Sequence, residues 1–216
     1  MADECCYRKG DTLAALAAKA GQRRVLIIVM AINLAMFLVE FGGGLAARSS
    51  ALMADSVDML GDALVYALSL YALHRGPRWE AGAAIAKGVI ILGFGMVVLV
   101  EIADKLVHGI PPSSTLMLAF GSGALAANLL CLGLLWRFRG ANVNMRSTFE
   151  CSRNDVLSNI GVLVAAGLVA ATSAAWPDIA VGTVVVLLFL RSAWRVLAEA
   201  IPAWRGARPQ RPEALR

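Results

Sequence analysis

Six long apolar runs constrain the fold of this chain more than any other feature of its sequence. They lie at roughly residues 25–46, 51–73, 82–104, 114–136, 147–171 and 177–199. A helix of about 20 apolar residues crosses the ~30 Å hydrocarbon core of a bilayer. Proline, which breaks helix interiors, is absent from these runs except at Pro177, which opens the last one. The pattern predicts an all-α integral membrane protein with six transmembrane helices.

The composition agrees with this fold class. Hydrophobic residues make up 59% of the chain and charged residues 16%, whereas soluble domains have about 45–50% and about 25%. The first apolar run is longer than the 7–15 residues of a signal-peptide core, so we expect it to be retained. We therefore divide the chain into an N-terminal segment at 1–24, a six-helix transmembrane domain at 25–200 and a short tail at 201–216.

Lysine and arginine placement predicts the topology. These residues gather at 8–24, 75–78, 137–146 and 205–216, which would share one side of the membrane, while only Arg48 and Lys105 fall on the other side. Basic loops remain in the cytoplasm, so both termini are predicted to be cytoplasmic in a multi-pass protein of the inner (plasma) membrane. The net charge of +5 then reflects this bias. We expect contact with membrane lipid and no nucleic-acid partner.

Acidic residues inside the second run are the strongest functional signal. Asp55, Asp58 and Asp62 are spaced by three and four residues, so a helix would place them on one face. Ionised carboxylates at bilayer depth are costly and usually functional. A transported cation or bound protons would neutralise them.

The fifth run contains a second pair with the same spacing. Cys151 and Asp155 are four residues apart and share a helix face, as Asp58 and Asp62 do. If the two pairs face each other, they provide three carboxylates and one thiol, a set that suits a four-coordinate zinc ion. The thiolate favours zinc or cadmium over magnesium or calcium. The alternative is that these groups only hold helices together by hydrogen bonds.

Four ionised ligands would leave net negative charge even with a divalent ion bound. Repulsion and poor solvation favour protonated acids when the ion is absent. We therefore expect metal binding to displace protons, and returning protons to help release the metal.

Several polar residues outside the four candidate ligands are candidates for supporting roles. Glu40, Asp55 and Asn154 are candidates for a proton relay or for groups that support the ligands. Cys5 and Cys6 are candidates for metal capture in the cytoplasm. Lys105 is expected to be solvated near the outer end of the third run, and Lys87 to extend toward the inner surface. The glycines at 42–44 are expected to allow close helix packing.

Three stretches of the sequence are informative together: 38–62 (LVEFGGGLAARSSALMADSVDMLGD), 155–166 (DVLSNIGVLVAA) and 176–178 (WPD). They resemble the first two helices, the fifth helix and the start of the sixth helix of the cation diffusion facilitator family. The resemblance implies a six-helix, usually homodimeric transporter that exports divalent transition metals in exchange for protons. It places the transport site on Asp58, Asp62, Cys151 and Asp155. Zinc is the favoured metal, with cadmium and cobalt as further candidates.

Two departures from the family pattern affect these expectations. Cys151 stands where the family has histidine, so the candidate site contains no histidine. Only a short tail follows the sixth run, where the family commonly has a cytoplasmic domain, so we expect a member lacking that domain and any homodimer to form through the membrane helices.

Two other functions were weighed against transport. One is a membrane protein that binds or handles metal without transporting it. The other is an enzyme resembling CDP-alcohol phosphatidyltransferases, but the DxxDG that should precede Ala47-Arg48 is missing, and Val57 stands where that signature needs glycine. Nucleotide-binding glycine motifs are also absent from the sequence. The chain is therefore not expected to be an enzyme or to need a cofactor.

Overall fold

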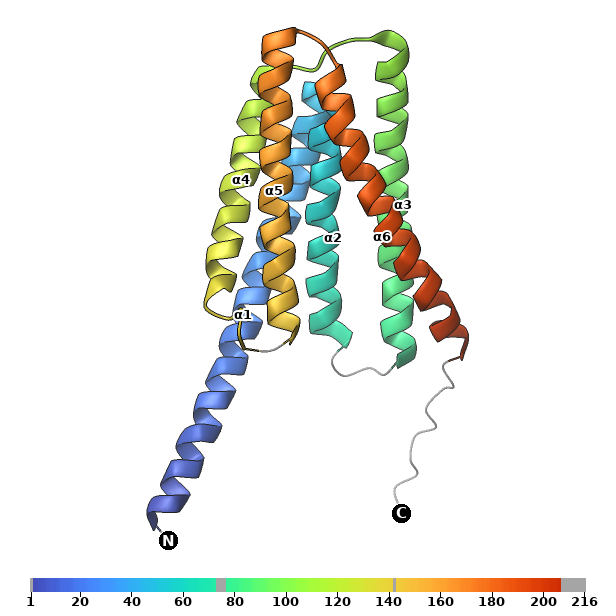
Figure 1. The fold of residues 1–216 in the computed structure, drawn as a ribbon. Coiled ribbons are helices and arrows are strands. Elements are labelled where there is room, and N and C mark those ends of the chain that lie inside the picture. The colour runs from blue at the N-terminus through green and yellow to red at the C-terminus, as the bar shows by residue number, and fades with distance from the viewer. Residues whose placement is uncertain (1, 73–76, 142, 207–216) are drawn as a thin grey trace.

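The computed structural model describes residues 2–72, 77–141 and 143–206, and every regular element in these ranges is an α-helix. The prediction of an all-α protein with six helices is confirmed (Figure 1). The helices are α1 (Ala2–Ala47), α2 (Ser50–Ala72), α3 (Pro77–His108), α4 (Ser114–Trp136), α5 (Val143–Thr172) and α6 (Trp176–Gly206).

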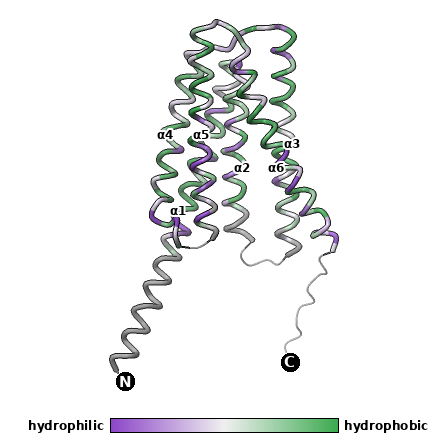
Figure 2. Tube along the Cα trace, viewed as in Figure 1, coloured by the Kyte–Doolittle hydropathy of each residue, from purple (hydrophilic) through white to green (hydrophobic). Residues whose placement is uncertain are grey.

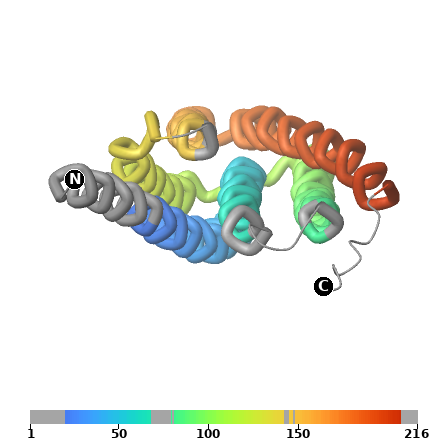
Figure 3. Tube along the Cα trace, turned by 90° about the horizontal axis from the view of Figure 1, so that it is seen from below, coloured from blue at the N-terminus to red at the C-terminus, as the bar shows by residue number. Residues whose placement is uncertain are grey.

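The helices run up and down in one bundle, and α2 lies at its centre. Seen from the end in Figure 3, α2 lies between α1 and α3 and opposite α5 and α6, and it contacts each of the other five helices. Close pairs form between α1 and α2, between α4 and α5, and between α3 and α6. Side chains of α2 can therefore contact several neighbouring helices.

Five helices of the described residues contain a stretch long and apolar enough to cross a membrane, and α2 is the exception. Its middle contains Asp55, Asp58 and Asp62, and Figure 2 shows hydrophilic positions within otherwise apolar helices of the bundle. Because other helices cover α2, it does not need a fully apolar surface.

Several helices are longer than the apolar runs suggested, α1 and α6 among them. Helix α1 is continuous from Ala2, although its candidate span begins at Ala20. Helix α6 continues to Gly206 with Pro202 inside it. Pro177 lies in the first turn of α6, where the missing N–H of proline is tolerated.

A tight turn joins α1 to α2. Arg48 has a φ of 52°, the left-handed conformation that ends many helices. Ser49 follows and accepts a 3.1 Å hydrogen bond from the backbone N–H of Leu52, so it caps α2. Gly44 lies against α2, since a Cβ there would be 3.0 Å from the backbone nitrogen of Met53. The predicted close packing by glycine is present at this position.

Both described ends of the chain lie at one end of the bundle (Figure 1). At the opposite end, Lys105 of α3 is only 3% exposed and forms an ion pair with Asp178 of α6. The expectation that Lys105 is solvated is therefore wrong. Its ammonium lies within the helix packing because a buried carboxylate provides its counter-charge.

Candidate metal site

A cavity of about 250 Å³ lies between α2, α5 and α6. One part of its lining is polar and comes from α2 and α5. The part that comes from α6 is apolar. The lining residues are Asp58, Asp62, Cys151, Asn154, Asp155, Ser158, Val185, Leu188 and Phe189.

All four residues that the sequence singled out as ligands line this cavity. The carboxyl group of Asp155 is in hydrogen-bonding range of both Asp58 and Asp62. Asp155 is 5% exposed, whereas Cys151 is exposed. The two i, i+4 pairs of α2 and α5 therefore face each other, since neighbouring positions on each helix project their side chains to the same side.

The four groups do not converge on one point in this conformation. In the ranges that the structure describes, no three His, Cys, Asp or Glu side chains are arranged to hold a metal ion. The set of donors suits zinc or cadmium, but tetrahedral coordination at Zn–O distances of ~2.0–2.2 Å and Zn–S of ~2.3 Å requires the side chains to close further. Rotation of Cys151 toward the three carboxylates would be part of that closure.

Two residues that sequence reasoning missed act on these ligands. The hydroxyl of Tyr66 donates a 2.7 Å hydrogen bond to Oδ2 of Asp62. Lys87 of α3 is half-buried, and its charge acts on Asp58, Asp62 and Cys151. The position of Tyr66, four residues after Asp62, was a usable signal in the sequence. No comparable signal in the sequence pointed to Lys87, because its distance from Asp58 and Asp62 depends on how α3 packs in the bundle.

Asp55 does not line the cavity. Its two carboxylate oxygens accept hydrogen bonds from Ser158 Oγ at 2.6 Å and from Asn159 Nδ2 at 2.5 Å, both on α5. It lies three residues, or about 4.5 Å of helix rise, from Asp58 toward the end of the bundle opposite the termini. Asp58 and Asp62 therefore line the cavity, whereas Asp55 is bonded to α5 through Asn159 and through Ser158, a residue of the cavity lining.

Glu40 of α1 is fully buried beside Asp55. Neither of its carboxylate oxygens receives a hydrogen bond from an ordinary donor in the described residues. The two carboxyl groups are in hydrogen-bonding range of each other, and a bond between two carboxyls requires a proton on one of them. An ionised Glu40 without a donor would be expensive at this depth.

Of the three remaining candidates, Asn154 lines the cavity beside Asp155. The side chains of Cys5 and Cys6 lie outside what the structure describes, so metal capture by them stays a prediction.

The sequence matches one protein family over most of its length. Residues 26–203 match the family described as the cation efflux transmembrane domain. This range runs from within α1 to within α6 and includes every residue that lines the cavity.

Several curated proteins are similar to the chain. The metal cation efflux system protein CzcD of Cupriavidus metallidurans is 27% identical over 84% of this chain and 64% of its own length. The zinc transporter ZitB of Escherichia coli is 28% identical, with coverages of 82% and 61%. A cadmium, cobalt and zinc/H(+)-K(+) antiporter of Bacillus velezensis is 26% identical, with coverages of 85% and 63%. The chain thus spans less than two thirds of the length of these relatives.

Proposed function

Because the chain belongs to the cation efflux family, also called the cation diffusion facilitator family, we propose that it exports divalent transition-metal ions from the cytoplasm in exchange for protons. The observation that carries this proposal is the meeting of two ligand pairs, Asp58/Asp62 and Cys151/Asp155, at one cavity among membrane-spanning helices. Such groups are rare at bilayer depth and are usually functional.

Zinc is the proposed principal substrate, with cadmium and cobalt as further substrates. Relatives that carry these metals in their names support the choice. The ligand chemistry supports it too, because three carboxylates suit zinc and a thiolate strengthens binding of softer ions such as cadmium. The apolar wall formed by Val185, Leu188 and Phe189 offers no competing ligands from α6.

Charge balance supports coupling to protons. The three carboxylates lie close together and away from bulk water, so they repel one another when ionised. Protons relieve this repulsion in the empty site, and an arriving divalent ion displaces them. Protons that enter from the other side then compete with the metal for the same oxygens.

Glu40 and Asp55 form the proposed second place for a proton. Both oxygens of Asp55 already accept hydrogen bonds from neutral donors of α5, which stabilises its ionised form. Glu40 has no such donor, so the proton shared by the pair belongs on Glu40. The charge of Asp58 also acts on Glu40, and the pair can therefore respond to what the cavity holds.

The relative placement of the helices suits alternating access. Asp58 and Asp62 are on the central helix, and helices rocking around that position would expose the cavity to one side at a time. We place the termini in the cytoplasm of a plasma-membrane protein, on the basis of the lysine and arginine bias. We also propose a homodimer that forms through the membrane helices.

Flux measured beside binding tests this proposal. The purified chain in proteoliposomes should move zinc when a pH gradient is imposed, and Asp155→Ala should abolish this flux. Glu150→Gln is the matched control, because Glu150 pairs with Arg153 in a partly exposed salt bridge outside the cavity lining. Zinc binding without flux would instead favour a metal-handling protein, and flux indifferent to the pH gradient would remove the proton coupling.

A further inference from the structure

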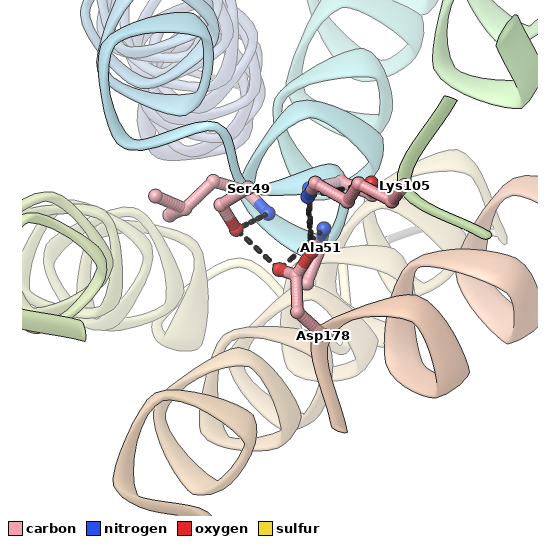
Figure 4. Close-up of polar contacts among 6 residues, drawn as sticks. Ser49, Ala51, Lys105 and Asp178 are labelled. Carbon is pink, nitrogen blue, oxygen red and sulfur yellow. Dashed lines mark hydrogen bonds and ion pairs between the residues drawn. The ribbon is translucent and has the colours of Figure 1, made fainter. Parts of the chain in front are cut away.

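A buried polar cluster joins three helices at the end of the bundle opposite the termini (Figure 4). Asp178 of α6 lies at its centre and is fully buried. Its Oδ2 accepts a 2.6 Å bond from Lys105 Nζ and a 2.9 Å bond from the N–H of Ser50. Its Oδ1 accepts a 2.5 Å bond from Ser49 Oγ and a 3.1 Å bond from the N–H of Ala51. Lys105 also donates to Ser50 Oγ at 2.9 Å.

Each buried side-chain nitrogen and oxygen atom of this cluster has at least one hydrogen-bond partner. A carboxylate has about four acceptor positions, and Asp178 uses four. The first N–H groups of a helix lack intrahelical partners and carry partial positive charge, and two of those in α2 are taken up by Asp178. The carboxylate thus binds the first turn of α2 and the ammonium of α3 to α6.

The helices also approach closely at this place. A Cβ on Gly182, one turn after Asp178 in α6, would lie 2.9 Å from the carbonyl carbon of Ser50. Since real Cβ atoms essentially never come so near, only glycine lets the backbone of α6 rest on the start of α2. The polar cluster and this backbone contact together close the space between α2 and α6.

The closed end lies on the route out of the candidate metal site. Ser50 is eight residues before Asp58, which is about 12 Å along the helix axis. The intervening side chains of Leu52, Met53, Ala54 and Val57 are all buried. Cys151, in contrast, lines the cavity and is exposed. The cavity lining thus has an exposed residue, Cys151, in the half of α5 nearer the termini, and buried side chains lie between the cavity and Asp178.

We propose that Lys105, Asp178 and the first turn of α2 form a gate that seals the outer end of the transport pathway and must separate before a metal ion leaves there. Neither Lys105 nor Asp178 lines the metal cavity, so their role is to hold the helices that surround the pathway. This inference rests on the proposed transport function and adds the place where the pathway closes.

Sided labelling of Cys151 tests the gate without measuring transport. In a Cys5→Ser/Cys6→Ser/Cys131→Ala background, Cys151 is the only remaining thiol. A membrane-impermeant maleimide is applied to right-side-out and inside-out vesicles, with an N-terminal tag identifying the side of the termini. The background protein should react from the side of the termini and resist reagent from the opposite side.

Two variants should raise labelling from the opposite side several-fold. Lys105→Met removes the bond from α3 and leaves Asp178 its three donors on α2. Gly182→Ala pushes α6 away from Ser50 without removing a buried charge. If Lys105→Met fails to fold, Gly182→Ala still tests the gate.

Each of the two variants has a matched control. Asp104→Asn alters an exposed pair with His108 next to Lys105, and Gly167→Ala adds a methyl group where no atom lies within 4 Å. Both should leave labelling unchanged, and reaction from the side of the termini reports the folded protein. If Lys105→Met and Gly182→Ala resist labelling from the opposite side as the controls do, the gate is refuted. That result would leave metal flux, and hence the proposed function, undisturbed.

Discussion

Tyr66 holds Asp62 from one turn further along α2, through a hydroxyl that donates a 2.7 Å hydrogen bond to Oδ2. Its ring is buried and packs among apolar residues that include Val29, Leu135 and Phe149. The ring thus fixes the hydroxyl, and the hydroxyl fixes one oxygen of a candidate ligand. Asp62 has its orientation set before a metal ion arrives.

The variant Tyr66→Phe should therefore weaken metal binding while preserving the fold. The substitution keeps the packed ring and removes only the donor. Loss of a group that orients a ligand typically lowers metal affinity by about 10–100-fold, and we expect the lower end of this range. Calorimetric titration of the purified protein with zinc measures the change. Wild-type affinity in Tyr66→Phe would show that the hydroxyl does not support the site.

Exchange of the thiol should alter selectivity. Cys151→Ser replaces the soft sulfur donor with a hydroxyl, so cadmium flux should fall more than zinc flux. Cys151→His should move selectivity toward zinc, which readily accepts imidazole. Cys131→Ala is the control, because Cys131 is buried in an apolar cluster and does not line the cavity. Equal zinc and cadmium transport by Cys151→Ser and wild type would contradict a ligand role for the thiolate.

The variant Glu40→Gln should separate metal binding from proton coupling. A glutamine amide can donate to Asp55 but cannot release a proton, so the shared proton is lost. Exchange of labelled for unlabelled zinc at equal pH should continue, while uptake driven by a pH gradient should fall sharply. Glu199→Gln, on an exposed position of α6, serves as the control. Unchanged pH-driven uptake by Glu40→Gln would remove Glu40 from the proton route.

The contact between α1 and α2 can be tested through two neighbouring glycines. In Gly44→Ala the new Cβ would lie 3.0 Å from the backbone nitrogen of Met53, and such overpacking costs about 1–3 kcal/mol. Gly42→Ala meets no atom within 4 Å and should be neutral or stabilise the helix by about 0.5–1 kcal/mol. Thermal unfolding in detergent measures both, and equal effects of the two changes would argue against the close contact.

Sequence alone was sufficient for the fold class and for placing the two members of each candidate ligand pair on one helix face. The six helices follow from run length, because a bilayer requires about 20 apolar residues per crossing. The pairing of Asp58 and Asp62, and of Cys151 and Asp155, follows from helical spacing. That both pairs line one cavity depends on tertiary packing, which the charges inside apolar runs could only suggest.

The same reasoning failed where a residue's environment depends on distant partners. Lys105 ends an apolar run, a position that usually indicates solvent, but its partner Asp178 comes from another helix 73 residues away. Asp55 shares the helical stripe of Asp58 and Asp62, yet it does not line the cavity and instead accepts hydrogen bonds from Ser158 and Asn159 of α5. Residue spacing predicts which face of a helix a side chain occupies. It does not predict which residue of a neighbouring helix that side chain contacts.

The central position of α2 also has a consequence for how the protein enters the membrane. Each of its three aspartates would oppose insertion of an isolated helix, at about 2.5–3.5 kcal/mol for a charged side chain near the bilayer centre. The apolar part of α1, Ala20–Ala47, precedes α2 in the chain and is joined to it by only Arg48 and Ser49. The translocon should therefore release α1 and α2 to lipid as a hairpin, with Glu40 and Asp55 already together before the later helices are synthesised.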